Sequence, residues 1–145
     1  MSRHGAFASA AAVFVVAGIA LGFWNLGGPS RQREINADER RSSDLARISG
    51  AIGRWYQADG KLPPDIDAVR AREPGLTVQD PVTHAMYPYK PAAGSKYQLC
   101  ATFARNTEPT PVPPWQDARF APHPAGDHCF SLDARTNWSR PAIAP

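Results

Sequence analysis

The most prominent pattern in the chain is a nearly uninterrupted run of apolar residues from Ala6 to Leu26. The run contains no charged side chain, and as a helix rising about 1.5 Å per residue it would cover about 30 Å, the thickness of a hydrocarbon core. Trp24 lies near its end, where an indole suits the membrane interface, and Gly27-Gly28-Pro29 then interrupts the pattern. The pattern predicts an N-terminal transmembrane helix.

A cleaved signal peptide is the alternative for this segment. Arg3 and His4 would form its charged region, but the apolar run is long for a signal peptide and ends without an A-x-A site. We therefore expect a permanent anchor. Gly18 and Gly22 stand four residues apart within it, a spacing that lets two membrane helices approach closely, so they are the candidate packing residues of the anchor.

A second periodic segment runs from Asn36 to Asp59, where apolar residues recur at steps of three and four. This spacing places them on one face of an amphipathic helix. Gly60 ends the helix, and Asp65 to Glu73 follows as a short second helix that ends before Pro74-Gly75. The predicted packing face of the long helix consists of Leu45, Ile48, Ile52, Trp55 and Tyr56.

From residue 76 the period changes to two, which indicates strands. We predict strands at Met86 to Pro91, Tyr97 to Ala104 and His128 to Asp133, with residues 92–96 forming a hairpin connection. In the middle strand Tyr97, Leu99, Ala101 and Phe103 share the face that should meet the long helix. Residues 105–126 contain six prolines, so we expect a long loop there, pinned in part by Trp115 and Phe120.

The two cysteines lie in two of these predicted strands. Pairing the strands with their apolar faces together places Cys100 and Cys129 on the same opposite side, and neighbouring antiparallel positions are close enough for a disulfide. We predict that bond. A structural disulfide indicates an oxidising compartment outside the cytoplasm.

The charge of the chain changes this picture in one respect. Among its 145 residues, 16 Lys and Arg stand against 13 Asp and Glu, and the two signs alternate along the long helix. We therefore expect the charged side chains of this helix to be solvated, and we do not expect nucleic-acid binding. The arginines that follow the anchor outnumber Arg3, which by the positive-inside rule would leave the C-terminal domain in the cytoplasm. The cysteines indicate the opposite orientation. Because long C-terminal domains translocate largely regardless of flanking charge, we expect export.

The order of these parts resembles the type IV pilin and type II secretion pseudopilin superfamily. The resemblance covers about residues 36 to 133, and a related set of single-pass bacterial membrane proteins shares Leu99 to Phe103, Gly126 and the Cys129-Phe130 run. The matching positions are Asp44-Leu45, Ile48, Ala51-Ile52, Trp55-Tyr56, Gly60, Leu62-Pro63, Asp80-Pro81, Thr83, Tyr87 and Tyr89.

Three positions depart from the pattern of that superfamily. Pilins carry a Glu five residues into the mature helix, whereas here no acid precedes Glu34, so we expect neither prepilin processing nor salt-bridged assembly into a filament. His84 stands where the family's D-P-x-T-G-x-P motif has glycine, and Met86 stands in place of its second proline. The chain is thus expected to keep the fold without the polymerising motif.

No residue pattern indicates catalysis or a bound cofactor. His84, His123 and His128 lack the spacing of zinc ligands, and no Gly-rich phosphate loop, nucleophile elbow or carboxylate pair is present. The resemblance leaves calcium open as an alternative, with Asp80, Asp117 and Asp127 as candidate ligands. Asp80 is otherwise expected to cap the turn before Pro81. We expect no enzyme, no cofactor and no small-molecule substrate.

These expectations define an α+β, pilin-like fold with an N-terminal transmembrane helix and an amphipathic helix packed on a small antiparallel sheet. Its parts would be an anchor (1–28), a linker (29–35), the domain (36–133) and a flexible tail (134–145). The expected function is non-enzymatic assembly or scaffolding in the bacterial envelope, with the chain in the inner membrane, its domain in the periplasm, and membrane or envelope proteins as partners. The alternative is an accessory subunit of a larger integral-membrane complex.

Overall fold

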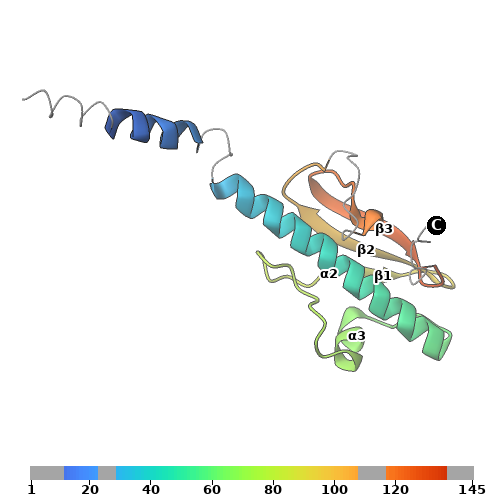
Figure 1. The fold of residues 1–145 in the computed structure, drawn as a ribbon. Coiled ribbons are helices and arrows are strands. Elements are labelled where there is room, and N and C mark those ends of the chain that lie inside the picture. The colour runs from blue at the N-terminus through green and yellow to red at the C-terminus, as the bar shows by residue number, and fades with distance from the viewer. Residues whose placement is uncertain (1–11, 23–28, 108–116, 137–145) are drawn as a thin grey trace, which may run out of the picture. The chain divides into compact units, whose positions relative to one another are not determined.

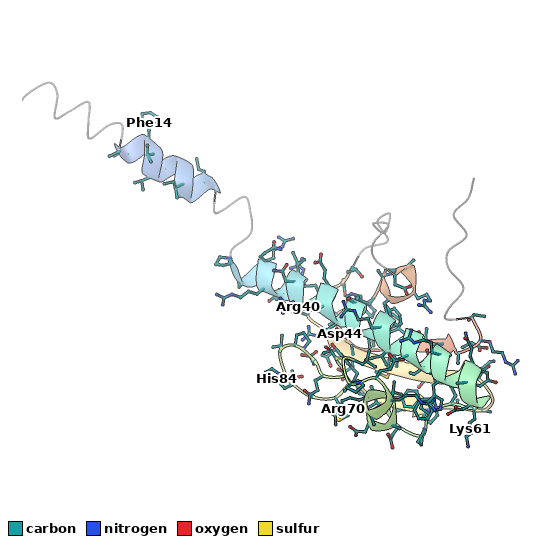
Figure 2. The ribbon with its side chains drawn as sticks, turned by 60° about the horizontal axis from the view of Figure 1, so that its bottom comes forward. Phe14, Arg40, Asp44, Lys61, Arg70 and His84 are labelled. Atoms are coloured by element: carbon teal, nitrogen blue, oxygen red, sulfur yellow. A yellow bond between two sulfur atoms is a disulfide. The ribbon has the colours of Figure 1, made fainter. Side chains whose placement is uncertain are left out.

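A computed structural model describes residues 12–22, 29–107 and 117–136, which belong to two compact units, Met1–Glu34 and Ile35–Pro145. In the first unit residues 12–22 form a helix with exposed apolar side chains, among them Phe14 at 80% exposure (Figure 2). Across the described ranges, we find no helix with the length and apolar character needed to cross a membrane. The predicted span also includes residues 6–11 and 23–26, which lie outside the described residues.

The long helix α2 spans Pro29–Asp59 and begins seven residues before Asn36, its predicted start. Residues 29–35, expected to form a linker, are its first turns. Proline suits the first turn of a helix because the N–H it lacks has no intrahelical acceptor there. These turns carry no apolar stripe, so periodicity could not reveal them. At the other end, Gly60 adopts a φ of 70° and donates its N–H to the carbonyl of Tyr56 at 2.8 Å.

The buried face of α2 follows the predicted stripe along its whole second half. Leu45, Ile48 and Ile52 are fully buried, and Tyr56 is partly buried against the same core. Trp55 is half-buried, and the guanidinium of Arg72 lies 4.0 Å from its ring centroid. The stripe is thus the surface that α2 presents to the rest of the domain.

The short helix α3 (Ile66–Arg72) lies near the C-terminal part of α2 (Figure 1). Asp65 caps it by accepting the N–H of Ala68 at 2.7 Å, and Ile66 and Val69 are buried. Arg72 also pairs with Asp59 at the end of α2 at 3.1 Å. The predicted second helix is therefore confirmed within one residue at each end.

The sheet contains β1 (Tyr89–Pro91), β2 (Lys96–Phe103) and β3 (Gly126–Asp133) in the order β1-β2-β3, with antiparallel pairing throughout. Figure 1 shows α2 lying along this sheet. Tyr97, Leu99 and Phe103 are buried on the face toward the helix, and the Tyr97 hydroxyl donates to Ser49 Oγ of α2 at 3.0 Å. The α+β class and the predicted inner face of the middle strand are confirmed.

The first strand is shorter than predicted. Residues 86–88 are not part of β1: the carbonyl of Pro88 still accepts the N–H of Cys100 at 3.0 Å, but Met86 forms an isolated bridge with Gln79 instead of pairing with β2. In the loop that follows β2, Phe120 is fully buried, as predicted, within the 3-10 helix η1 (Ala118–Phe120). Trp115, the other residue expected to pin this loop, lies outside the described residues.

The predicted tail does not begin at residue 134. Ala134 is fully buried, and its N–H donates to the carbonyl of Ser95 at 2.9 Å. The chain therefore stays attached to the β1–β2 turn for at least one residue beyond β3. Residues 137–145 lie outside the described ranges.

Candidate functional site

The disulfide between Cys100 and Cys129 joins β2 to β3, as predicted, with an S–S distance of 2.03 Å and the two Cα atoms 4.0 Å apart. The two residues are direct partners in the strand register. A Cα separation this short belongs to a non-hydrogen-bonded antiparallel pair, in which the backbone N–H and C=O groups point away from the partner strand. The bond therefore clamps the two longest strands on the outer face of the sheet.

A buried group of three charges joins the first half of α2 to the turn that begins at Asp80. Arg41 donates from Nη1 to Asp38 Oδ1 at 2.7 Å and from Nη2 to Asp80 Oδ1 at 3.1 Å, with a further bond from Nε to Asp80 Oδ2. All three side chains are more than nine-tenths buried. The prediction that the charged side chains of this helix are solvated is wrong for Asp38 and Arg41.

Asp80 stabilises a turn as well as the ion pair. Its Oδ1 accepts the N–H groups of Val82 at 2.8 Å and Thr83 at 2.9 Å, which is the turn-capping role expected before Pro81. Burial alone would raise the pKa of Asp80, but the hydrogen bonds from Arg41, Thr83 and Val82 outweigh it and hold that pKa well below its ordinary value. Asp80 is therefore ionised across the physiological range.

Asp38 ties α2 to the end of β2. Its two carboxylate oxygens accept the N–H groups of Ala104 and Arg105, each at 3.0 Å. Together, Asp38 and Asp80 connect Arg41 to two segments that are distant in the sequence. This arrangement sets the position of α2 relative to both segments.

A second carboxylate on α2 has different surroundings. The Tyr87 hydroxyl donates to Asp44 Oδ2 at 3.2 Å, and Asp44 is half-buried beside it. Burial raises the pKa of Asp44, and it raises the pKa of Tyr87 still further above its usual range. Figure 2 shows Asp44 on α2 together with its exposed neighbour Arg40.

A cavity of about 290 Å³ lies beside the disulfide, between residues 85–88 and β2. Its apolar lining includes Met86, Pro88 and the two cysteines. Its charged lining residues are Lys90, Asp127 and Asp80, and the carboxylate of Asp80 is already paired with Arg41. A small volume with a few polar groups of this kind suits a small ligand group or a short piece of extended chain.

The residues considered as metal ligands have protein partners instead. Asp80 pairs with Arg41, Asp117 pairs with Arg119, and Asp127 accepts a hydrogen bond from the Thr102 hydroxyl. In the described part of the chain, no group of three or more His, Cys, Asp or Glu is placed to hold a metal ion.

The three histidines considered as zinc ligands have separate environments. His84 adopts a φ of 58° on an exposed loop, where Figure 2 labels it. His123 is buried with its ring stacked on Phe103 at 3.5 Å between centroids, and this burial lowers its pKa. His128 packs edge-on against Phe130.

The candidate packing residues of the anchor, Gly18 and Gly22, lie in the helix of residues 12–22. A Cβ built at either glycine would meet no atom within 4 Å in the structure as described. Their role in helix packing therefore stays a prediction.

Sequence reasoning missed the buried charges, although one signal was present. Asp38 and Arg41 fall on the same helical face as Leu45, Ile48 and Ile52, because they continue the steps of three and four toward the N-terminus. Charged residues on a buried stripe require partners. Asp80 lies 39 residues away from Arg41 in the sequence, and the spacing could not identify it.

We compared the chain with protein-family models, with curated proteins and with solved structures, and found no match.

Proposed function

We propose that the chain is a pilin-like, single-pass envelope protein whose domain is exported and serves assembly or scaffolding rather than catalysis. The Cys100–Cys129 disulfide carries this proposal. Structural disulfides persist in oxidising compartments such as the bacterial periplasm and are rare in the cytosol. A domain clamped by this bond is suited to the periplasmic side of the inner membrane.

The architecture of the domain supports the same proposal. A long helix lies along a three-stranded antiparallel sheet, which is the arrangement that the resemblance to pseudopilins implies. The turn that begins at Asp80-Pro81 supports it further. His84, at the position of the family's glycine, adopts a left-handed φ of 58° that glycine reaches without strain.

The anchor belongs to the proposal as well. The apolar run from Ala6 to Leu26 would hold the chain in the membrane, with Gly18 and Gly22 available for packing against other membrane helices. With no acid before Glu34, we propose that the domain acts as a membrane-tethered module for envelope partners and is not a filament subunit.

The redox state of the cysteines in the native cell tests this proposal. Cells are lysed into denaturant with an alkylating reagent, without reductant, and the mass of the full chain is measured. We expect no alkyl groups on Cys100 or Cys129 before reduction and two after it. The Cys100→Ser/Cys129→Ser variant is the control and takes up none in either case. Two alkylated thiols before reduction would overturn the proposal of export.

A further inference from the structure

Residues 85–88, which precede β1, diverge from β2 on the N-terminal side of Pro88. The last hydrogen bond between them runs from the N–H of Cys100 to the carbonyl of Pro88 at 3.0 Å. Pro88 has no N–H to return to the Cys100 carbonyl, so the ladder loses its next rung at this position. From here toward Ala85 the segment pairs with residues 78–80 instead.

The separation leaves backbone groups of β2 open on this side. Because Cys100 and Cys129 form a non-hydrogen-bonded pair, the backbone groups of Cys100 point away from β3, and with a period of two those of Thr102 do so as well. In the described ranges, no backbone hydrogen bond joins Thr102 to residues 85–88. The Cys100 carbonyl and both backbone groups of Thr102 thus face the cavity.

The opposite wall of the cavity, formed by residues 85–87, also has backbone groups that point into it. The bonds Asp80 N–H to Ala85 C=O and Tyr87 N–H to Val78 C=O flank the bridge between Gln79 and Met86, each at 2.9 to 3.0 Å. This pattern makes Gln79 and Met86 a non-hydrogen-bonded pair, so the N–H and C=O of Met86 point toward β2. The cavity of about 290 Å³ therefore lies between two facing strand edges.

One end of this space is closed and the other is open. At Pro88 and Cys100 the two edges rejoin through a hydrogen bond, so an inserted chain cannot continue past them. Lys90, two residues beyond Pro88, lines the cavity and supplies a cation at the closed end. Asp127, the register partner of Thr102, lies at the open end.

We propose that this cavity, a wedge between residues 85–88 and residues 100–102 of β2, binds the C-terminal end of an extended peptide from a partner chain. The terminal carboxylate of the peptide would lie at Lys90. The peptide would run antiparallel to β2, bond to the backbone of Thr102 and Met86, and place a small apolar side chain against the disulfide. Strand addition and the capture of a terminal carboxylate are established modes of peptide recognition. The proposal goes beyond the envelope function, because it depends only on the geometry of the domain.

The test uses the full chain, labelled with ¹⁵N in detergent micelles. The probe is an acetylated Thr-Val-Thr-Ala peptide with a free C-terminal carboxylate at millimolar concentration, and the matched probe is its C-terminal amide. We expect the amide protons of Thr102 and Met86 to exchange quickly in the free protein and to become protected with the acid peptide. The amide peptide should bind about tenfold more weakly, the effect of losing one charge-assisted interaction.

Two lysine variants locate the carboxylate. Lys90→Gln should remove the preference for the acid over the amide, whereas Lys61→Gln, an exposed lysine beyond α2, should preserve it. Protection of Thr102 and Met86 without peptide would overturn the proposal, since the wedge would then be closed. Equal binding of both peptides, binding that perturbs other residues only, or no response to either peptide would overturn it as well.

Discussion

Arg41 and Asp80 lie 39 residues apart in the sequence and form a bidentate ion pair inside the domain. The exposed fraction is 7% for the Arg41 side chain and 8% for that of Asp80. Asp38 adds a second carboxylate to the same guanidinium. Removing one member of such a group leaves its partners buried and uncompensated, which costs more than the pair itself contributes.

Substitution of Arg41 should therefore be strongly destabilising. We expect Arg41→Ala to lower the free energy of unfolding by about 3 to 5 kcal/mol, because it leaves two buried carboxylates without their cation. Arg40→Ala is the matched control on the exposed side of α2 and should change stability by about 0.5 kcal/mol or less. Urea unfolding of both variants in the same micelles measures the difference. Equal effects would contradict the burial of Arg41.

The carboxylate of Asp80 should make the domain sensitive to acid. Its pKa is depressed in the folded state, so its stabilisation is fully present above the unfolded pKa of about 3.9 and is lost as the pH falls toward the folded value. We expect the free energy of unfolding to decline below about pH 5, and Asp80→Asn to reduce that decline while lowering stability at pH 7. If Asp80→Asn left the decline in the free energy of unfolding at acid pH unchanged, groups other than Asp80 would be its cause.

Ionisation of Asp44 should lower the stability of the domain, whereas ionisation of Asp80 raises it. Burial raises its pKa, so the ionised form opposes folding at neutral pH and protonation relieves that penalty as the pH falls through the raised value. Asp44→Asn keeps an acceptor for the Tyr87 hydroxyl and should leave stability at pH 7 unchanged or higher. Thermal melts of the two Asn variants, run side by side at pH 7, test this contrast. A loss at Asp44→Asn as large as that at Asp80→Asn would contradict it.

The left-handed conformation of His84 can be tested by restoring glycine. With a φ of 58°, a residue that has a Cβ is strained, so His84→Gly should stabilise the domain by about 1 kcal/mol. His84→Ala removes the imidazole but keeps the Cβ, and it should produce little change. Denaturant midpoints of the three proteins provide the measurement. If alanine stabilised the domain as much as glycine, the imidazole and not the backbone would be the cause.

The disulfide closes a loop between residues that are 29 apart in the sequence. In the chain-entropy account, opening such a loop should cost about 3 to 4 kcal/mol of stability. We expect reductant to lower the urea midpoint of the native chain and to leave that of the Cys100→Ser/Cys129→Ser variant unchanged. A native midpoint that reductant does not move would mean that the bond contributes little to the fold.

Features that depend on local periodicity were predictable from the sequence. The buried stripe of α2, the inner face of β2 and the shared side of Cys100 and Cys129 all follow from spacings of three, four or two. The early turns of α2 carry no apolar stripe, so their helical state could not be read from a pattern. The buried charge group depends on the Arg41–Asp80 contact, and the cavity depends on the pairing of Met86 with Gln79 instead of with β2. Both features depend on contacts between residues that are distant from the local pattern. The missing N–H of Pro88 is the one local signal that pairing with β2 ends there.

The side of the membrane on which the domain lies tests the central claim most directly. Lys61→Cys places a thiol at an exposed position beyond α2, and Ser2→Cys places one before the predicted anchor. Both variants are treated with a membrane-impermeant maleimide in intact spheroplasts and again after permeabilisation. Export predicts that the Lys61→Cys chain is labelled in intact spheroplasts, while the Ser2→Cys chain is labelled only after permeabilisation. Labelling of Ser2→Cys alone in intact spheroplasts would place the domain in the cytoplasm and contradict the account.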